Sequence, residues 1–418
     1  MKTTKRLALF LVAGMLLGLA SCKKDMFDQE DYEEIVSSAN PVDSIDVLHE
    51  WKLLQNKVAI ITPNVGDTDI AYIQILNGNP YDGSGTAEVM AQMPSNRGQR
   101  VALVYDLPIG LKQVYAALVT STGKYYVKAF KPSEVDISFA SGNIIREGNF
   151  VKPKNQTYTY IYEGTFPMPD DFDFNDVVMR LSMEVPSDTL LKLTVTLVAV
   201  GTMNQMAGAL RLVGVPYEQV QSVTIDEGEA FDSNYPLTRQ MLPFDATYTD
   251  GNDGYAVLSL FEDAHWALSH TMDKLGNIRH IYYNTQVTSK EDESAKVPTK
   301  TRTFSIHLKD GFRASDLQLS NMDPFVINSF NGSFFEVHIH RYKFGEVLWS
   351  YTGGDSNAYN DHMAWALLIP DDSFRYPLEG IALGTYRDGQ IAGVYSKYRH
   401  SFGEWGRDRN AATDWWQN

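Results

Sequence analysis

Apolar and polar residues alternate with a period of two along much of the chain. Every second residue from Val177 to Val185 is apolar, and most of the residues between them are polar. The run from Leu193 to Ala199 repeats the alternation, and the Pro, Ser and Asp residues at 186–188 favour a turn between the two runs. Successive side chains of a strand point to opposite faces, so period two is typical of half-buried strands. The pattern predicts a β-hairpin.

A second pair of runs supports the same fold class. Residues Val114 to Thr120 and Tyr125 to Phe130 are rich in β-forming side chains and flank a Ser-Thr-Gly-Lys segment that favours a turn. We find no helical period of comparable length. With 23 Tyr and 20 Phe as well, the chain is predicted to be all-β, with two or more packed β-sandwich domains behind a signal peptide and a tether.

The domain limits follow from shifts in this pattern. At about 150 residues per domain, the 418 residues suggest two or three units. We place an N-terminal β-sandwich domain at 46–150 and a larger β-rich domain at 151–418. Within the latter, residues 286–301 include a charged run without apolar alternation, so we expect an exposed insertion there.

The first residues have the features of an export signal. Lys2, Lys5 and Arg6 precede a run of 14 mostly apolar residues from Leu7 to Ala20, which is too short to span a bilayer and suits a signal peptide. The run ends in Leu-Ala-Ser-Cys, which resembles the lipobox of bacterial lipoproteins. That resemblance implies cleavage of residues 1–21 and a lipid on the new N-terminal Cys22. The chain is then predicted to attach to a membrane through this anchor.

The segment after Cys22 predicts where the anchored protein lies. Residues 22–45 begin with two lysines, continue with many Asp and Glu residues, and contain few large apolar side chains, so we expect a solvated acidic tether. A plain spacer would have the same composition. The segment also resembles the signal that sends Bacteroidetes lipoproteins to the outer face of the outer membrane. We therefore expect an outer-membrane lipoprotein exposed at the cell surface.

Charge and cysteine content exclude several function classes. Lys and Arg number 36 against 52 Asp and Glu, a formal charge of −16, which argues against nucleic acid as a partner. One cysteine excludes a disulfide framework, a thiolate zinc cluster and a CxxC redox pair. That single cysteine is the predicted lipidation site.

A loop just before Val177 carries the clearest binding chemistry. Asp171, Asp173 and Asn175 stand at every second position, and Asp176 adds a further carboxylate. A Ca²⁺ ion takes six to eight oxygen ligands, several of them anionic, so this spacing predicts a calcium site. The loop is not an EF-hand, because Asp176 occupies the position of the required glycine. The alternative is an Asx-rich turn that binds nothing, although its carboxylates would then repel one another.

The same loop belongs to a wider set of motifs that resembles the LruC domain family of bacterial lipoproteins. The resemblance spans roughly residues 155–418 and rests on Glu163, the Asp171–Val178 stretch, Pro324-Phe325, Glu336-Val337-His338-Ile339, Trp365, Pro370, Phe374, Pro377, Glu379, Tyr398, Phe402, Trp405 and Asp414-Trp415-Trp416. It implies a largely uncharacterised β-rich surface domain, found in Bacteroidetes and Leptospira, with no established enzymatic activity. Here the strand continues through His340 where the family often has Gly or Pro-Thr. We add Glu163 as an expected calcium ligand from outside the loop.

A second polar group lies on a predicted strand. Alternation from Phe335 places Glu336, His338 and His340 on one face, where two histidines two residues apart could reach one zinc ion. We do not expect zinc, because nothing nearby supplies the remaining ligands and such residues are more often hydrogen-bonded polar groups on a sheet.

The predicted function is binding rather than catalysis. The sequence has no Gly-x-Ser-x-Gly elbow, Walker loop or His-Glu-x-x-His helix, so we expect no enzyme, although a glycosidase carboxylate pair would leave no signature. We predict a surface-tethered, calcium-stabilised lipoprotein acting in adhesion, binding of a host or envelope protein, or envelope structure. The first alternative is a glycan-binding component of a polysaccharide uptake system, with Trp405, Trp415 and Trp416 stacking on sugars. The second is a fimbria-like structural subunit.

Overall fold

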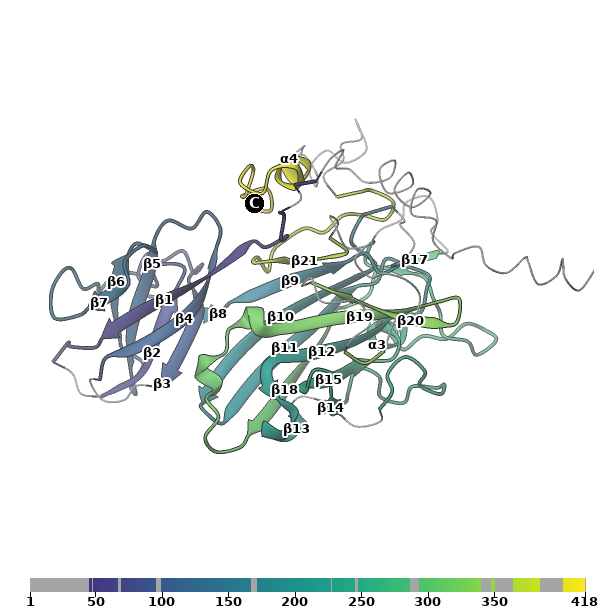
Figure 1. Cartoon of the computed structure of the whole chain (residues 1–418), viewed down its shortest axis with the longest axis horizontal. Helices are drawn as coiled ribbons and strands as arrows, with labels where there is room; N and C mark the ends of the chain where they lie inside the picture. Colours follow the sequence, from purple (N-terminus) through teal and green to yellow (C-terminus); the bar gives the residue numbers. More distant parts are fainter. Residues whose placement is uncertain are drawn as a thin grey trace, which may run out of the picture.

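The computed structural model describes residues 45–417, apart from residues 47, 67–68, 95–98, 167–170, 227, 245–246, 286–292, 340–346, 350–363 and 384–400. The predicted signal peptide, Cys22 and the tether up to residue 44 lie outside the described residues, as does His340. The predicted all-β fold class is confirmed, because strands dominate the described chain and helices are few and short (Figure 1).

The N-terminal strands form one sandwich. A three-stranded sheet of order β4-β1-β7 faces a five-stranded sheet of order β6-β5-β2-β3-β8. Apolar residues from both sheets form the core between them. The strands are β1 (Leu54–Thr62), β2 (Ile70–Leu76), β3 (Glu88–Pro94), β4 (Val101–Pro108), β5 (Val114–Thr120), β6 (Tyr125–Phe130), β7 (Asp136–Ser138) and β8 (Lys154–Asn155).

The remaining strands form a larger sandwich. Its six-stranded sheet has the order β13-β18-β11-β10-β9-β21, and its five-stranded sheet has the order β14-β15-β12-β19-β20. The strands are β9 (Thr157–Tyr162), β10 (Val177–Ser187), β11 (Leu190–Ala199), β12 (Ala207–Pro216), β13 (Val220–Ile225), β14 (Tyr248–Asp250), β15 (Tyr255–Phe261), β18 (Lys300–Leu308), β19 (Met322–Phe330), β20 (Ser333–His338) and β21 (Ala366–Ile369).

Short elements connect these strands. They are the helices α3 (Ala264–Ser269) and α4 (Ser401–Arg407), the 3₁₀ turns η1 (Tyr217–Gln219), η3 (Ala314–Asp316) and η4 (Leu319–Asn321), and the two-stranded ribbon of β16 (Tyr282–Tyr283) and β17 (Ser294–Ala295). Across the described residues, no helix has the length and apolar character needed to cross a membrane.

The two predicted hairpins are present. β5 pairs antiparallel with β6, and β10 pairs antiparallel with β11. Within β10, Val177, Met179, Leu181 and Val185 are buried in the core between the two sheets, as the alternation predicts. Val178 is also buried although it points to the other face. Another apolar layer therefore covers the outer face of this sheet.

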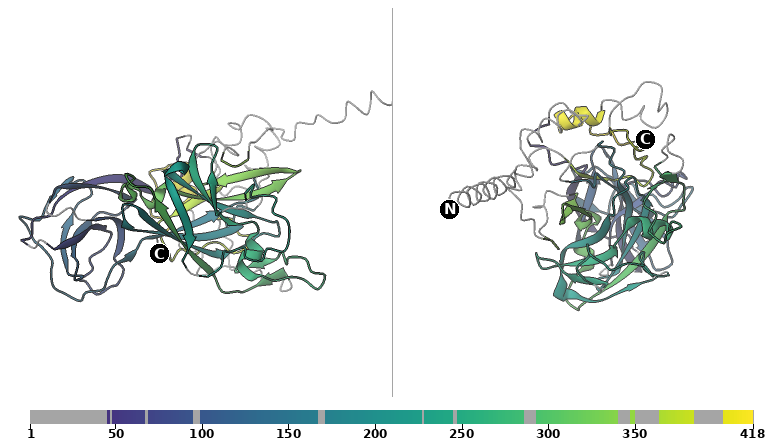
Figure 2. Two further views of the ribbon diagram at one scale, coloured as in Figure 1. Left: turned by 90° about the horizontal axis from the view of Figure 1, so that it is seen from below. Right: turned by 90° about the vertical axis from the view of Figure 1, so that its right-hand side faces the viewer.

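That layer is an apolar cluster, here called the outer cluster, built on the outer face of the six-stranded sheet. Figures 1 and 2 show α4, in yellow, on this side of the molecule above β9 and β21. The outer cluster joins residues from the sheet, from the Asp171 loop, from the chain before β1 and from the C-terminal segment. Its buried members are Trp51, Leu53, Ile161, Phe172, Phe174, Val178, Val198, Ala199, Ala364, Leu367, Ile369, Phe374, Leu383, Phe402, Trp405, Trp415 and Trp416.

The start of the described chain belongs to this cluster rather than to the N-terminal sandwich. The Asp46 backbone N–H donates to the Gly406 carbonyl at 2.9 Å, and the His49 ring Nε2 donates to the Trp405 carbonyl at 2.9 Å. Trp51 packs edge-on against Trp405. Asp46, His49 and Trp51, which fall within the predicted 46–150 domain, thus pack with α4. Local pattern could not show this, because the partners lie more than 350 residues away.

The predicted insertion at 286–301 is only partly described. Residues 286–292 lie outside the described chain, but β17 and the start of β18 fall within the rest. β18 pairs with β11 from Lys300 onward. The outward face of this pair is polar, with Thr196 and Thr301 hydroxyls 2.8 Å apart. The described residues between β17 and β18 are exposed or half-buried and lie outside any strand, so strand pairing in the described part of the predicted insertion is limited to β17 and the start of β18.

Candidate functional site

The predicted calcium loop lies where two neighbouring strands end. Glu163 follows β9 and Asp176 precedes β10, and these strands pair antiparallel with Val177 opposite Tyr162. The two acidic residues therefore stand at the same edge of the sheet. Asn175 forms a parallel bridge to Tyr162 as well. Sheet pairing thus brings Glu163 to the loop although it lies eight positions before Asp171 in the chain.

The backbone conformation of the loop places its two Phe side chains apart from its Asp and Asn side chains. Phe172 and Phe174 both have φ of +54°, the left-handed region that costs an L-residue roughly 1–2 kcal/mol. Both rings are buried in the outer cluster, and burial of a Phe side chain contributes about 1.5–3 kcal/mol. Apolar packing can therefore offset the strain. Asp171, Asp173 and Asn175 alternate with these rings along the loop and contribute no side chain to the cluster, so their polar groups form the other side of the loop.

Three carboxylates meet on that side. One oxygen from each of Glu163, Asp171 and Asp173 lies within 4.8 Å of the others. Glu163 and Asp173 are buried, whereas Asp171 is partly accessible. A donor set made only of carboxylate oxygens suits a hard cation such as Ca²⁺. The structure thus brings together three of the five residues expected to bind calcium, in a geometry that one cation can bridge.

Asp173 lies at the centre of the negative charge. Burial raises its pKa well above the ordinary value of 3.8, and the charges of Asp171, Glu163, Asp176 and Glu379 raise it further. Hydrogen bonds offset only part of the free-energy cost of ionising this buried carboxyl group. The Asp173 carboxylate accepts from the Asn175 backbone N–H at 3.0 Å and from the Gly380 N–H at 2.9 Å. A bound cation would neutralise the charge that these bonds leave.

Asn175 and Asp176 hold the loop in place. Asp176 Oδ2 accepts the Gly164 N–H at 2.6 Å. Asn175 Nδ2 donates to Asp173 Oδ2 at 2.8 Å and to the Pro377 carbonyl at 3.1 Å. Its Oδ1 consequently points toward Gly201, where a Cβ atom would lie 1.5 Å from it. In this arrangement the two residues expected as further calcium ligands position the carboxylates.

Sequence reasoning assigned no role to the C-terminal contacts of this site. Pro377, Glu379 and Gly380 approach the loop from a segment about 200 residues further along the chain. The Leu383 N–H also donates to the Phe172 carbonyl at 2.8 Å. Pro377 and Glu379 belong to the family resemblance, but no local sequence pattern relates them to Asp173. The loop therefore connects the six-stranded sheet to the C-terminal segment through hydrogen bonds.

The second predicted polar group is a buried ion-pair network. His338 Nδ1 lies 2.9 Å from Asp323 Oδ2, and Nε2 lies 3.0 Å from Glu336 Oε2. Glu336 also accepts the N–H groups of Leu348 at 2.7 Å and Trp349 at 2.9 Å. Burial alone would lower the pKa of His338, but the carboxylates of Asp323 and Glu336 outweigh it and raise the pKa to about 9. The protonated ring donates from Nδ1 to Asp323 and from Nε2 to Glu336.

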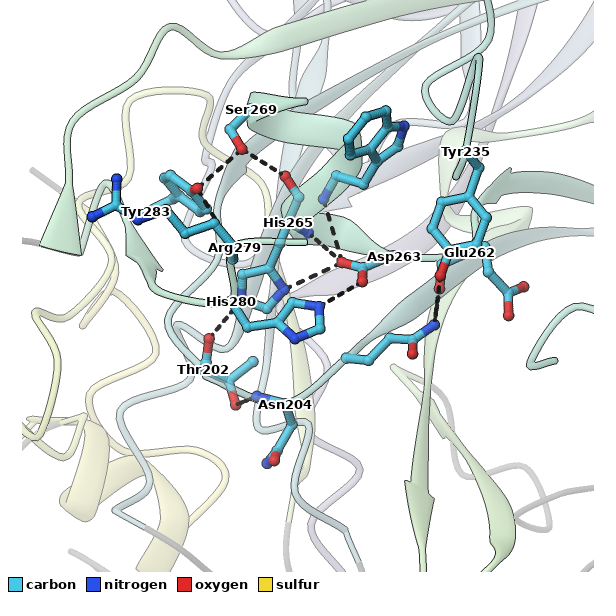
Figure 3. Close-up of polar contacts among 12 residues, drawn as sticks. Thr202, Asn204, Tyr235, Glu262, Asp263, His265, Ser269, Arg279, His280 and Tyr283 are labelled. Carbon is cyan, nitrogen blue, oxygen red and sulfur yellow. Dashed lines mark hydrogen bonds and ion pairs between the residues drawn. The ribbon is translucent and has the colours of Figure 1, made fainter. Parts of the chain in front are cut away.

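A third polar cluster was not foreseen from the sequence. Asp263, His265 and His280 converge beside the start of α3 (Figure 3), with one ligand atom of each within 4.8 Å of the others. Asp263 Oδ1 caps α3 by accepting the His265 N–H at 2.8 Å, and its Oδ2 lies 2.7 Å from His280 Nε2. An Asp-x-His pair is common in sequences, and His280 is 17 residues away. Only the fold brings the three together.

Fold and site together define the class: an all-β protein of two sandwiches with buried polar clusters in the larger one. A comparison with protein-family models matches residues 189–416 to the family described as "Domain of unknown function (DUF4842)". This match covers more than half of the chain, so the chain belongs to that family. Glu163 and the Asp171 loop precede the matched residues. The finer resemblance to the LruC domain family stays a prediction.

A search of curated proteins found no match. Among solved structures, the chain is similar to one described as "Putative lipoprotein from Bacteroides ovatus", at 15% sequence identity and a TM-score of 0.47. The similarity covers 84% of this chain and 98% of that chain.

Proposed function

We propose that this chain is a lipid-anchored, surface-exposed envelope protein whose larger sandwich is stabilised by calcium and which acts by binding or adhesion, or as envelope structure. The proposed calcium site rests on one observation, the convergence of the Glu163 and Asp171 carboxylates on the buried carboxylate of Asp173. The lipobox-like end of the leader at Cys22 supports the anchor. No catalytic step enters this proposal.

Calcium would act structurally at this site. The loop contacts Gly380 and Pro377 directly, so cation binding to Asp171 and Asp173 would strengthen the attachment of the C-terminal segment. Partial exposure of Asp171 gives the ion a route from solvent. Outside the cell envelope, millimolar calcium would keep such a site occupied even at the modest affinity of extracellular modules, about 10⁻⁴–10⁻³ M.

Burial of the C-terminal tryptophans removes the support for the glycan-binding alternative. Trp405, Trp415 and Trp416 are 1%, 2% and 6% exposed and belong to the outer cluster. Trp415 packs against the rings of Phe402 and Trp405, and the low exposure of all three tryptophans leaves little ring surface for a sugar. These side chains stabilise the fold. The described residues contain no observation that favours a fimbria-like subunit either.

Thermal unfolding tests the calcium site. Calcium that binds only the folded protein at a hundredfold excess over Kd raises the free energy of unfolding by about 2.7 kcal/mol. We expect this rise in the wild type and its loss in Asp171→Asn, which removes one carboxylate at a partly exposed position. Calorimetry in the presence of calcium, of chelator and of magnesium measures this change in stability.

Asp310→Asn serves as the matched control, because Asp310 is an exposed acid far along the chain from the loop. This variant should respond to calcium as the wild type does. A wild type that unfolds at the same temperature with calcium and with chelator would refute the site. An equal response in Asp171→Asn would place calcium elsewhere.

A further inference from the structure

The Asp263 cluster combines donor types that differ from those of the calcium loop. It offers two imidazoles and one carboxylate, whereas the Asp171 loop offers oxygens alone. Imidazole nitrogen is a preferred ligand of zinc and similar transition-metal ions, and calcium avoids it. The two clusters should therefore select different cations.

His265 is already oriented as a metal ligand. The ring is fully buried, and its Nε2 lies 2.8 Å from the Thr202 carbonyl, so Nε2 carries the hydrogen and donates it. Metal-binding histidines commonly donate their second ring N–H to a backbone carbonyl in this way. In the neutral ring the lone pair then resides on Nδ1. That atom faces Asp263 Oδ1, itself an acceptor, at 3.3 Å (Figure 3).

This separation fits two ligands of one ion. Zinc binds nitrogen and oxygen at about 2.0–2.1 Å, so two ligands of a tetrahedral site stand roughly 3.3 Å apart. Two facing lone pairs at that distance repel each other unless a proton or a cation lies between them. The Asp263 carboxylate is held rigidly, because its Oδ1 also accepts the N–H groups of His265 and Trp266 at the start of α3.

His280 completes the set from a different segment. Its Nε2 lies 2.7 Å from Asp263 Oδ2, and its side chain is about one third exposed. For both side chains to bind one ion, this contact opens by roughly 0.6 Å, toward the separation of tetrahedral ligands. Partial exposure allows that shift and gives the ion access. Three protein ligands leave a fourth position for water.

We propose that Asp263, His265 and His280 form a binding site for one zinc ion or a similar divalent transition-metal ion. Zinc titration of the purified protein by calorimetry, in excess calcium to occupy the oxygen cluster, should show one equivalent bound. Cobalt(II) in place of zinc should give the intense visible absorption of a tetrahedral site. The spectrum should lack thiolate bands, because the single cysteine of the chain, Cys22, is the predicted lipidation site.

His280→Ala is the decisive variant, because its partly exposed side chain can be removed without a cavity in the core. Loss of a direct ligand should weaken zinc binding by more than the roughly 10–100-fold typical of losing an outer-shell partner. His307→Ala is the matched control, since His307 is exposed on β18. It should bind zinc as tightly as the wild type.

Two results would overturn the proposal. The first is a wild type that takes up no stoichiometric zinc, which would make the cluster a hydrogen-bonded cap of α3. The second is tight zinc binding that survives in His280→Ala, which would place the ion at another site. Circular dichroism of each variant confirms that the fold is retained in the comparison.

Discussion

His338 illustrates how the environment of a single residue sets its chemistry. The side chain lies between the carboxylates of Asp323 and Glu336, and its ring stacks on Phe325. Arg211 also approaches Asp323, with 3.6 Å between Nε and Oδ2. A buried network with both charges present is stable only while each partner stays ionised. The histidine therefore acts as a fixed cation between β19 and β20.

The raised pKa of His338 predicts a pH dependence of stability. A base whose pKa rises from 6.5 to about 9 on folding stabilises the fold fully below pH 6.5. That contribution is lost as the pH rises from 6.5 through 9, with a maximum slope of about 1.4 kcal/mol per pH unit. Denaturant unfolding of the wild type and His338→Gln between these pH values should show the slope in the wild type alone.

His307→Gln provides the control for that measurement, because it changes an exposed histidine on β18. Its stability should follow the wild type across the pH range. Equal slopes in the wild type and His338→Gln would show that the network does not hold an imidazolium.

At the scale of elements, the C-terminal segment behaves as an additional layer on the six-stranded sheet. α4 places Trp405 against Trp51 and Trp415, and β21 extends the sheet beside β9. The sheet is thereby buried on both faces at this end. This explains why Val178 is apolar although it points away from the core between the two sheets. The Asp171 loop lies where this layer meets the sheet.

Truncation of one tryptophan tests the contribution of this layer. Trp405 is 1% exposed, and replacing a buried Trp by Ala costs about 3–5 kcal/mol. We expect Trp405→Ala to lower the free energy of unfolding by this amount in denaturant titration. Leu275→Ala, at an 86% exposed position, should change it by less than about 0.5 kcal/mol. A similarly small effect in Trp405→Ala would mean that α4 does not cover the sheet.

At the scale of the whole molecule, the two ends of the described chain meet. Arg409 forms an ion pair with Asp46 at 3.2 Å, and Asp46 is also bonded to the Gly406 carbonyl. The described chain therefore begins beside α4. The sandwiches themselves are joined by Asp106 of β4, whose carboxylate accepts the Ser320 N–H at 2.9 Å and its hydroxyl at 2.7 Å.

Fatty-acid labelling in a bacterium that exports lipoproteins tests the anchor. The chain has one cysteine, so label incorporation reports on Cys22 alone. We expect a labelled, membrane-associated wild type, an unlabelled Cys22→Ser and a labelled Ser21→Ala as the matched control. Label that persists in Cys22→Ser would refute lipidation at this position. Full protection of the labelled wild type from protease added to intact cells would refute surface exposure.

The sequence by itself determined the fold class and the strands that form the hairpins. Alternation is a local property, because the pleat of one strand sends successive side chains to opposite faces. Val177 to Val185 could therefore be assigned to a strand, with its core face, without knowledge of its partners. The acidic loop was visible for the same reason, since Asp171, Asp173 and Asn175 are close along the chain.

The tertiary structure alone decided which distant residues complete each site. Gly380 reaches Asp173 and His280 reaches Asp263 only because strand pairing and packing of the C-terminal segment bring remote segments together. The same packing buried Glu336 on what alternation presented as a polar face. Burial then changed its role, because a charge removed from water must be matched by specific donors, and no local pattern encodes where those donors come from.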